Sequence, residues 1–260
     1  MLDKYNMTNK NVTLITGGAQ GIGAATAKRM ARFGHNIAIN YFSSKDKALV
    51  TAKECEALGA KVLLLPADVS NPEQCQQIVT TTVREFGRVD MLVNNAAFAG
   101  FSKTPIFELE QQSLDTFNQI FNTNVLGALA LSQAVTPYMR AQGKGVIVNI
   151  SSSAGITGFT STSIIYAASK GALNTLTLSL SKALAPIIRV NAICPAMVDS
   201  SWWEKKFADH KQQTDFVASM KKHNPLGRVI TPEEVANAVL FLYENENING
   251  ELLRIDSGAH

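Results

Sequence analysis

The chain has 260 residues, of which 46% are hydrophobic and 17% are charged. This apolar content excludes an intrinsically disordered protein, because so much apolar surface has to be buried. Lysine and arginine outnumber aspartate and glutamate by 24 to 21, and the basic residues are scattered, with short pairs such as Lys205-Lys206 and Lys221-Lys222. Such a small, scattered excess predicts neither a nucleic-acid partner nor a membrane-surface partner.

Three cysteines, Cys55, Cys75 and Cys194, form an odd set without CxxC or Cys/His spacing. That pattern argues against a disulfide framework and against structural zinc, so we expect no metal site. The first ten residues lack the apolar region of a secretory signal peptide. The uncharged stretch 116–139 contains several asparagines and glutamines, which favours a buried helix over a bilayer span. We therefore expect a cytoplasmic protein without a membrane segment.

Strand-like and helix-like segments alternate along the chain. In chain order the sequence predicts a strand at Val12–Thr16, a helix at Ala24–Phe33, a strand at Asn36–Tyr41, a helix at Lys45–Leu58, a strand at Lys61–Leu65, a helix from Asn71 to Phe86, a strand at Val89–Asn94, a helix at Leu114–Arg140, a strand at Gly145–Ser151, a helix at Ile164–Leu184, a strand at Ile188–Cys194, a helix from Thr231 to Tyr243 and a strand at Glu251–Ile255. The strands are continuously apolar, which is typical of a parallel sheet covered by helices on both faces.

No linker, composition break or repeat divides this pattern. We therefore predict an α/β fold with one doubly wound parallel-sheet domain over residues 1–260. The stretch from about 200 to 223 is helical in composition and carries Trp202-Trp203 between two core elements. It is predicted to form a helical lid over a site.

Glycines fill the turn between the first strand and the first helix, in Thr16-Gly17-Gly18-Ala19-Gln20-Gly21-Ile22-Gly23. Glycines at such a turn let the backbone approach a pyrophosphate, which then binds the N–H groups at the start of the helix. The spacing is GxxxGxG, and no Lys-Ser or Lys-Thr follows as it would in a P-loop. The strand–turn–helix context favours a dinucleotide site over a plain tight turn.

The end of the second strand bears on which dinucleotide binds. An NAD site needs an acid near this point to bind the ribose hydroxyl groups, but no carboxylate occurs here before Asp46. Asn40, Ser43 and Ser44 can hydrogen-bond a 2′-phosphate, and Lys45 can offset its charge. We therefore predict NADP as the cofactor, with NAD as the alternative, and expect NADPH to bind at least about tenfold tighter than NADH.

Tyr166-Ala-Ala-Ser-Lys170 places a phenol and an ammonium group at positions i and i+4 of one helix face. A neighbouring cation favours the phenolate and brings the pKa of the phenol toward neutral pH, so that Tyr166 can exchange a proton with a carbonyl or an alcohol. Upstream, Ser151-Ser152-Ser153 follows the fifth strand, where a hydroxyl group can polarise a carbonyl oxygen. Each motif alone also fits a solvated helix face or a plain turn.

Together these motifs resemble the short-chain dehydrogenase/reductase family over nearly the whole chain, from about Asn11 to Gly258. The matching segments are the TGxxxGIG turn at Thr16–Gly23, Ala67-Asp68-Val69, Asn94-Asn95-Ala96, Asn122-Thr123-Asn124, the serine run, YxxxK, Arg189-Val190-Asn191, Cys194-Pro195 and Asp256-Ser257-Gly258. Three small residues, Ala97, Ala196 and Ser257, stand where the family usually has glycine. These exchanges are tolerable if φ stays negative.

The resemblance implies a Rossmann fold and a role for each matching residue. Tyr166 is the acid/base, Lys170 lowers its pKa and holds the nicotinamide ribose, and Asn124 holds a water in the proton relay. Ser152 positions the substrate carbonyl, with Ser153 as the alternative. The cofactor-binding residues expected from the resemblance and from the second strand end are Gly17, Gln20, Gly21, Ile22, Gly23, Asn40, Ser43, Ser44, Asp68, Val69, Asn95, Ala96, Tyr166, Lys170, Pro195 and Val198.

The predicted function is that of an NADP-dependent oxidoreductase. It transfers a hydride between the nicotinamide and a small carbonyl or secondary-alcohol substrate, with Tyr166 moving the proton. The alternatives are an NAD-linked alcohol dehydrogenase and a non-catalytic dinucleotide-binding sensor. The family also implies a homo-oligomer, dimer or tetramer, through the helices predicted at Leu114–Arg140 and Ile164–Leu184.

The predicted lid bears on the substrate. Its aromatic residues either cover a hydrophobic ketone, or pack the lid on the body or a subunit interface; they are Trp202, Trp203, Phe207 and Phe216. The Asn40-Tyr41 strand end resembles the β-ketoacyl carrier-protein reductase branch of the family. The short uncharged loop from Leu184 to Ile188 counts modestly against an acidic carrier-protein partner.

Overall fold

A single parallel sheet organises the molecule. The computed structural model describes residues 10–100, 113–158, 163–200, 207 and 209–259. The strands in this part of the chain are β1 (Val12–Ile15), β2 (Asn36–Tyr41), β3 (Val62–Pro66), β4 (Met91–Asn94), β5 (Gly145–Ile150), β6 (Ile188–Pro195) and β7 (Leu252–Ile255). Their order across the sheet is β3-β2-β1-β4-β5-β6-β7, and every neighbouring pair is parallel. The predicted doubly wound α/β fold is confirmed.

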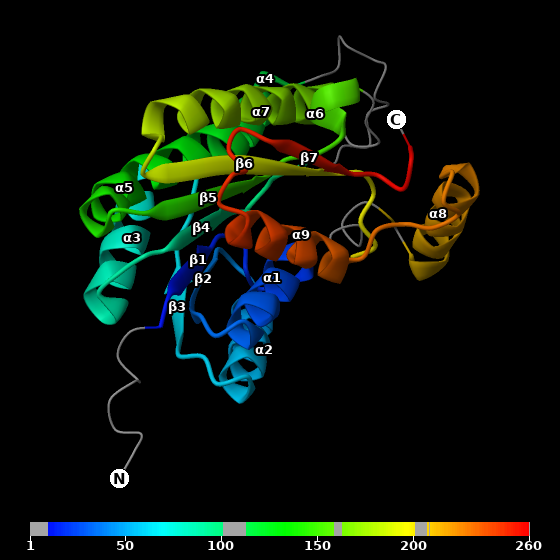
Figure 1. Ribbon diagram of the computed structural model, residues 1–260. Coiled ribbons are helices and arrows are strands. Elements are labelled where there is room, and N and C mark those ends of the chain that lie inside the picture. Colours follow the sequence, from blue (N-terminus) through cyan, green and yellow to red (C-terminus); the bar gives the residue numbers. More distant parts are fainter. Residues whose placement is uncertain (1–9, 101–112, 159–162, 201–206, 208, 260) are drawn as a thin grey trace.

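Helices cover both faces of this sheet. Those in the described residues are α1 (Gly21–Arg32), α2 (Lys45–Ala57), α3 (Pro72–Phe86), α4 (Leu114–Phe121), the π-helical turn η2 (Asn122–Leu126), α5 (Gly127–Gln142), α6 (Ala154–Thr157), α7 (Ile164–Leu184), α8 (His210–His223) and α9 (Pro232–Glu244). Figure 1 shows α1, α2 and α9 on one face and α3, α5 and α7 on the other. The order in which strands are added to the sheet reverses between β1 and β4, and a crevice at such a switch point is where open α/β sheets bind ligands.

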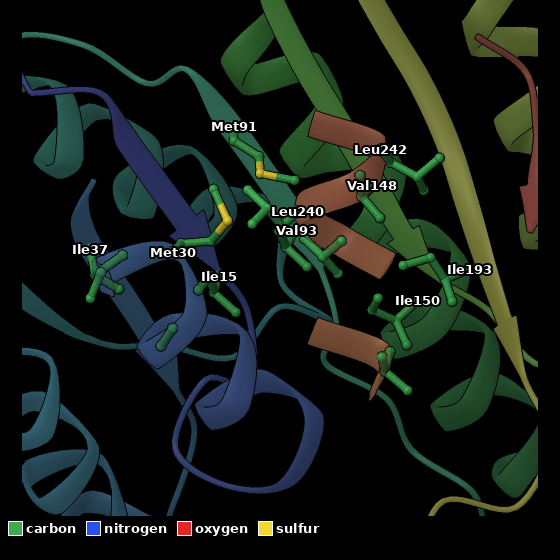
Figure 2. Close-up of a cluster of buried hydrophobic side chains, with 14 of the residues drawn as sticks. Ile15, Met30, Ile37, Met91, Val93, Val148, Ile150, Ile193, Leu240 and Leu242 are labelled. Atoms are coloured by element: carbon green, nitrogen blue, oxygen red, sulfur yellow. The ribbon is translucent and has the colours of Figure 1, made fainter. Parts of the chain in front are cut away.

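The core consists of two apolar layers, one on each face of the sheet. In the layer beneath α1 and α9, Ile15, Met30, Met91 and Val93 are fully buried and meet Leu240 of α9 (Figure 2). The second layer lies under α3, α5 and α7 and includes Leu92 and Ile147, from the same strands as the first layer. Burial on both faces is why the strands are continuously apolar in sequence.

Side chains cap several helices, among them α3 and α9. The Asn71 carboxamide oxygen accepts hydrogen bonds from the N–H groups of Glu73 and Gln74, and Pro72 follows it at the first helical position. Thr231 and Glu234 form a reciprocal capping box at the start of α9. These caps satisfy backbone N–H groups that the helix leaves without a partner, and so they fix where each helix begins.

The long helix predicted at Leu114–Arg140 is interrupted. It consists of α4, the wider five-residue turn η2 and α5, and it ends at Gln142 before Gly143, whose φ is 76°. Gly127, the first residue of α5, lies against the loop between β3 and α3. A Cβ at this position would sit 2.6 Å from the carbonyl oxygen of Val69 in that loop. Hydrophobic periodicity does not reveal one extra residue in a turn, so the sequence could not predict this interruption.

The fourth strand begins at Met91, two residues later than predicted, and Asp90 just before it binds the amino edge of the sheet through its side chain as well as its backbone. Its carboxylate accepts hydrogen bonds from the Val12 N–H at 2.8 Å and from Arg88 at 2.5 and 2.8 Å. Nearby, the Nδ1 of buried His35 lies 2.8 Å from the Thr13 hydroxyl oxygen, and its ring packs edge-on against Tyr243 at 4.8 Å. Within the described residues, its Nε2 is buried without a hydrogen-bond partner.

The buried imidazole predicts a loss of stability in acid. Burial lowers the pKa of His35 from 6.5 to about 4, so the folded state favours the neutral ring. The contribution of the neutral ring to the free energy of unfolding is complete above pH 6.5 and is lost as the pH falls from 6.5 toward 4. The loss amounts to about 2 kcal/mol at pH 5. We expect the melting temperature of the His35→Gln variant to fall less between pH 7.5 and pH 5 than that of the wild type. His223→Gln, on the exposed face of α8, is the control, and an unchanged fall in His35→Gln would refute this origin.

No helix among the described residues is long and apolar enough to cross a bilayer. The three cysteines are buried free thiols. The described residues also contain no cluster of three or more His, Cys, Asp or Glu side chains arranged for a metal ion.

Candidate active site

A cavity of about 870 Å³ lies at the carboxyl ends of the central strands. One end is formed by the turn after β1 and by the residues that follow β2 and β3, and the other by β5, α7 and the segment after β6. Most of the predicted site residues lie in its wall: Gly17, Gln20, Gly21, Ile22, Asn40, Ser43, Ser44, Asp68, Val69, Asn95, Ala96, Ser152, Tyr166, Lys170, Pro195 and Val198. Gly23 and Asn124 are not part of that wall.

The glycine-rich turn is fixed to the loop after β4. The Asn95 carboxamide donates to the carbonyl oxygens of Thr16 at 2.8 Å and Gly17 at 3.0 Å. In return, the Thr16 hydroxyl oxygen accepts from the N–H groups of Asn95 and Ala96 at 2.9 and 3.0 Å. Gly17 has a φ of 59°, a left-handed conformation that glycine adopts without strain. The turn is therefore tied to the neighbouring strand end by the side chains of Asn95 and Thr16.

Gly23 does not face the cavity but makes the turn possible. A Cβ at this position would collide with the Gly17 carbonyl oxygen and lie 2.8 Å from the Gly18 Cα. By contrast, a Cβ at Gly21, whose φ is 55°, would make only an ordinary contact of 3.7 Å with Ser200. The N-cap residue Gln20 makes no side-chain cap bond, so the start of α1 presents its N–H groups beside the cavity. That arrangement suits a pyrophosphate.

At the end of the cavity that follows β2 and β3, Asn40 forms part of the wall but has no N–H group left to donate to a ligand. It is 1% exposed, and its carboxamide donates to the carbonyl oxygens of Leu65 at 3.1 Å and Ala67 at 3.0 Å. Both of its N–H donors are therefore used within the protein. Ser43 and Ser44 follow at the cavity wall, and their hydroxyl groups can donate to a phosphate at this point.

Tyr166 and Ser152 form the centre of the other half. The Ser152 hydroxyl hydrogen-bonds to the phenol oxygen of Tyr166, which lowers the pKa of the phenol, while burial has the larger effect and raises it above its usual value. Ser163 caps α7 by accepting the Tyr166 N–H at 3.0 Å. Of the neighbouring serines, Ser151 donates its hydroxyl to the Lys170 carbonyl oxygen at 3.2 Å, and Ser153 lines the cavity beside Ser152. Ser152 is thus the serine that contacts the phenol.

Lys170 is 1% exposed, yet its ammonium group is satisfied. Its Nζ donates to the Ile150 carbonyl oxygen at 2.8 Å and lies 5.6 Å from the centre of the Tyr166 ring. Burial lowers the pKa of Lys170 to about 8. A cation thus stands beside the phenol, as the motif predicts. In this structure burial has the largest effect on the pKa of the phenol and raises it, while the hydrogen bond from Ser152 lowers it.

Asn124 lies beneath the cavity, in the middle of η2. Its carboxamide oxygen accepts the Phe98 N–H at 2.8 Å, and its amide group donates to the Phe98 carbonyl at 3.1 Å and the Ser169 hydroxyl at 3.0 Å. Both side-chain donors are therefore occupied. The side chain connects the loop after β4 to α7, one residue before Lys170, so the contacts point to a positioning role.

The predicted lid is described in part. Phe207 and Phe216 lie 5.1 Å apart and pack with Met197 and Val229, which favours packing of α8 on the body for these two aromatic residues. Met220 of α8 lines the cavity. Trp202, Trp203, Lys205 and Lys206 lie outside the described residues. Figure 1 shows α8 beside the carboxyl ends of the strands.

Two of the three glycine replacements keep an ordinary backbone, and one does not. Ala97 and Ala196 are outside the positive-φ region, but Ser257 has a φ of 54°. The carbonyl oxygen of Ser257 accepts the Leu226 N–H at 3.1 Å, just after α8. The expectation of a negative φ is therefore wrong at Ser257, which adopts the left-handed conformation while tying the C-terminal segment to the region after α8.

Known proteins match this chain over nearly its full length. A family model described as Enoyl-(Acyl carrier protein) reductase matches residues 17–260. The 3-oxoacyl-acyl-carrier-protein reductase FabG of Thermotoga maritima is 35% identical over 250 residues, with 95% of this chain and 96% of that protein covered. A solved short-chain dehydrogenase/reductase mutant from Serratia marcescens has a TM-score of 0.84 at 32% identity, covering 97% of this chain and 98% of that one. A short-chain type dehydrogenase/reductase from Mycobacterium marinum has a TM-score of 0.86 at 29% identity, covering 97% and 96%.

The fold, the site and these matches define an NAD(P)-dependent oxidoreductase acting on carbonyl or alcohol groups. The chain belongs to the short-chain dehydrogenase/reductase family. The residues present fit a nicotinamide dinucleotide. The left-handed Gly17 and Gly21 leave room beside the start of α1, and one continuous cavity joins this turn to Tyr166 and Lys170.

The structure adds residues that the motifs do not indicate. Phe42, Phe98, Gln119 and Met220 line the cavity, and Lys47 reaches the glycine-rich turn from α2. The aromatic and methionine residues carry no sequence signal for a site, because apolar residues usually belong to the core. Lys47 hydrogen-bonds to Gln20, which lies 27 residues away in sequence, and local sequence patterns do not predict such a contact.

Proposed function

We propose that this protein is an NADPH-dependent carbonyl reductase in which Tyr166 supplies the proton. The observation that carries the proposal is the Ser152–Tyr166–Lys170 group, which shares one cavity with an open glycine-rich turn. A bound nicotinamide would supply the hydride. The chain's residues then orient the ketone, exclude water and provide the proton, the division of work expected of a cofactor enzyme.

The contacts assign a step to each side chain. Ser152 donates a hydrogen bond toward the position of the substrate oxygen and holds that oxygen near the Tyr166 hydroxyl. The Tyr166 hydroxyl gives its proton to this oxygen as negative charge develops there. The Lys170 ammonium stabilises the resulting phenolate and holds the ribose, while Asn124 ties the loop at Phe98 to Ser169 of α7 and so positions the helix that carries Tyr166 and Lys170. Burial of the phenol keeps it protonated until a substrate arrives.

The choice of NADPH rests on the residues after β2. Ser43 and Ser44 line the cavity there, and the segment from β2 to Asp46 contains no carboxylate to bind a free 2′-hydroxyl. Asn40 stays in the proposal as a wall residue only, because its donors are used by Leu65 and Ala67. The name of the FabG relative is consistent with a reductase.

A ketone, including the ketone of a 3-oxoacyl thioester, is the proposed substrate. The wall near Tyr166 includes Phe98, Met197 and Met220, which suit an apolar chain beside the reacting carbon. The FabG relative is named for a carrier-protein-bound 3-oxoacyl group. The loop from Ala185 to Ile187 has no charged residue to receive an acidic carrier protein, so we favour a small thioester or a free ketone.

The test is the loss of NADPH absorbance with a panel of ketones that contains an acetoacetyl thioester. Turnover of the thioester would support the 3-oxoacyl branch, and turnover of other ketones alone would restrict the substrate to free carbonyl compounds. Oxidation of alcohols with NAD at a higher kcat/KM than ketone reduction with NADPH would overturn the proposal. Tight NADPH binding without turnover of any compound would favour a dinucleotide sensor.

Ser152 is expected to be the serine that the reaction needs. Ser152→Ala removes the hydroxyl group that contacts Tyr166 and should lower kcat by about 10²–10³, as loss of one donor to a developing oxyanion does. Ser153→Ala is the matched control: Ser153 lines the same cavity, but the hydroxyl group that contacts the Tyr166 phenol is that of Ser152, so kcat should stay within about threefold of wild type. The reverse order of the two variants would transfer the role to Ser153.

We also propose a cytoplasmic homo-oligomer, dimer or tetramer. Large apolar side chains are exposed on α4, η2 and α7, namely Leu114, Phe117, Leu126, Ile164 and Leu178, and Leu114 is 80% exposed. Exposed apolar residues of this kind, gathered on neighbouring helices, support an interface between copies of the chain. Light scattering that gave a monomeric mass at micromolar concentration would refute it.

A further inference from the structure

Ser257 holds a backbone conformation that a residue with a side chain disfavours. Its φ of 54° lies in the left-handed region, and it is the one residue other than glycine with a positive φ in the part of the chain that the structure describes. Strained backbone of this kind persists only where its surroundings fix it, and it is concentrated at functional sites. The contacts between the end of β7 and the cavity show what fixes Ser257.

Residues 256–259 form a closed turn after β7, which we call the C-terminal turn. The Asp256 carboxylate accepts the Gly258 N–H at 3.0 Å, and the Asp256 carbonyl oxygen accepts the Ala259 N–H at 3.0 Å. Arg254 donates to the other carboxylate oxygen of Asp256, also at 3.0 Å. These hydrogen bonds fix the shape of the turn, and the left-handed conformation of Ser257 is part of that shape.

The C-terminal turn is also tied to the end of α8. The Ser257 carbonyl oxygen accepts the Leu226 N–H at 3.1 Å. Gly258, at a φ of 83°, packs so closely on Pro225 that a Cβ there would lie 3.1 Å from the Pro225 Cβ. Pro225 and Leu226 follow α8 directly after its C-cap residue Asn224. A strained turn near the end of the chain therefore holds the segment that ends the helix beside the cavity.

Ala259 brings this turn into the wall of the catalytic half of the cavity. It lines the cavity, as does Met220 of α8. The strand before the turn, β7, pairs with the end of β6 through Ile255 and Pro195, and Pro195 lines the half of the cavity that contains Tyr166. Alanine has the smallest side chain that a wall residue other than glycine can have, so a larger residue at this position would narrow the cavity.

We propose that the C-terminal turn determines which ketones the cavity accepts, with Ala259 as the specificity-determining residue. This inference rests on the proposed reductase function and names the part of the chain that selects the substrate. The methyl group of Ala259 leaves room for a large apolar group on one side of the carbonyl. Ser257 keeps that methyl group and Met220 in a fixed relation, because it ties the turn to the segment after α8.

The test compares two ketones that share a reacting group and differ in size. Butanone is the small ketone, and benzylacetone is butanone with a phenyl group at the far end of its chain. Ala259→Leu should lower kcat/KM for benzylacetone at least about tenfold, since added methylene groups in an apolar pocket discriminate by about that much. It should leave kcat/KM for butanone and the dissociation constant of NADPH within about twofold.

The matched control is Ala218→Leu. It adds the same atoms to the exposed face of α8, outside the cavity wall, and should change neither the two kcat/KM values nor the dissociation constant of NADPH. The melting temperature of each variant checks that it is folded.

A second pair of variants tests whether the turn acts through its backbone. Ser257→Gly should retain the wild-type ratio of the two kcat/KM values, because glycine adopts a φ of 54° without strain. Ser257→Val should change that ratio by at least about threefold, because a β-branched residue is disfavoured at a positive φ and a small displacement of the wall alters how the substrate is held.

The outcomes distinguish this inference from the proposed function. An equal fall in kcat/KM for both ketones in Ala259→Leu, an unchanged ratio in that variant, or a matching change in Ala218→Leu would overturn the role of Ala259 and leave the reductase intact. A changed ratio in Ala259→Leu with none in Ser257→Val would overturn the part assigned to Ser257. A wild-type enzyme that reduces butanone but not benzylacetone would overturn the inference alone, and one that reduces no ketone would overturn the proposed function with it.

Discussion

Replacing Tyr166 by phenylalanine is expected to lower kcat for ketone reduction by at least about 10²–10⁴, the usual loss for a positioned acid/base. The change removes a single oxygen from a buried ring on α7 that contacts Ser152. The ring itself stays, so the packing of Tyr166 with Ala99, Ala154 and Ala167 is retained. Stopped-flow measurement of NADPH oxidation in a single turnover is the assay, since it reports the chemical step directly.

The matched control is Tyr138→Phe. Tyr138 is half-buried on α5 and does not line the cavity, so its hydroxyl group should be dispensable. NADPH affinity should be unchanged in both variants, because the phenol oxygen serves the proton step rather than the nucleotide's phosphates. Near wild-type turnover by Tyr166→Phe would refute the mechanism, and a matching loss in Tyr138→Phe would show that the effect is general.

Gly23→Ala is expected to have the largest effect on cofactor binding. The added methyl group would meet the backbone of Gly17 and Gly18, which cannot move aside as a side-chain tip can. Overpacking of this kind costs about 1–3 kcal/mol. The turn would relax away from α1, so we expect the dissociation constants of NADPH and NADH to rise together by at least about tenfold, a loss that corresponds to about 1.4 kcal/mol.

Gly171→Ala provides the comparison. This glycine lies inside α7, and a Cβ there would meet only the Gly155 carbonyl oxygen, at an ordinary 3.5 Å. Alanine in place of a helical glycine should stabilise the fold by about 0.5–1 kcal/mol. Thermal unfolding and nucleotide titration of both variants would settle the point: unchanged nucleotide binding in Gly23→Ala would show that the turn tolerates a side chain.

The fold could be predicted well because local patterns and burial agree. Apolar runs bounded by glycine and by capping residues gave the strands and most helices to within one or two residues, and α7 begins and ends where expected. The boundaries that were missed depend on tertiary contacts. The Asp90 side chain binds Val12 and Arg88 just before the fourth strand begins, and the turn η2 occurs where the periodicity of the helix shows no break.

For the site, too, the residues could be predicted from local patterns, whereas their tertiary contacts could not. The residues around Gly17, Ser152 and Tyr166 were predicted as a group because their motifs occur in a fixed order, and the structure brings them to one cavity. Their hydrogen-bond partners could not be predicted. The donors of Asn40 are used by Leu65 and Ala67, and those of Asn124 by Phe98 and Ser169. The hydrogen-bond partners of a carboxamide depend on which backbone atoms, far away in sequence, the fold brings next to it.

The π turn Asn122–Leu126 has a consequence for how this chain tolerates changes in length. Each residue of an α-helix turns the chain by about 100° and advances it by about 1.5 Å. Gly127 is held against Val69, so deleting one residue of the turn would rotate and shift α4 rather than α5. Gln119 would then leave the cavity wall, although no residue of α4 had been replaced. A deletion in this turn would therefore change which face of α4 meets the cavity, and it would alter the cavity through residues that are not themselves replaced.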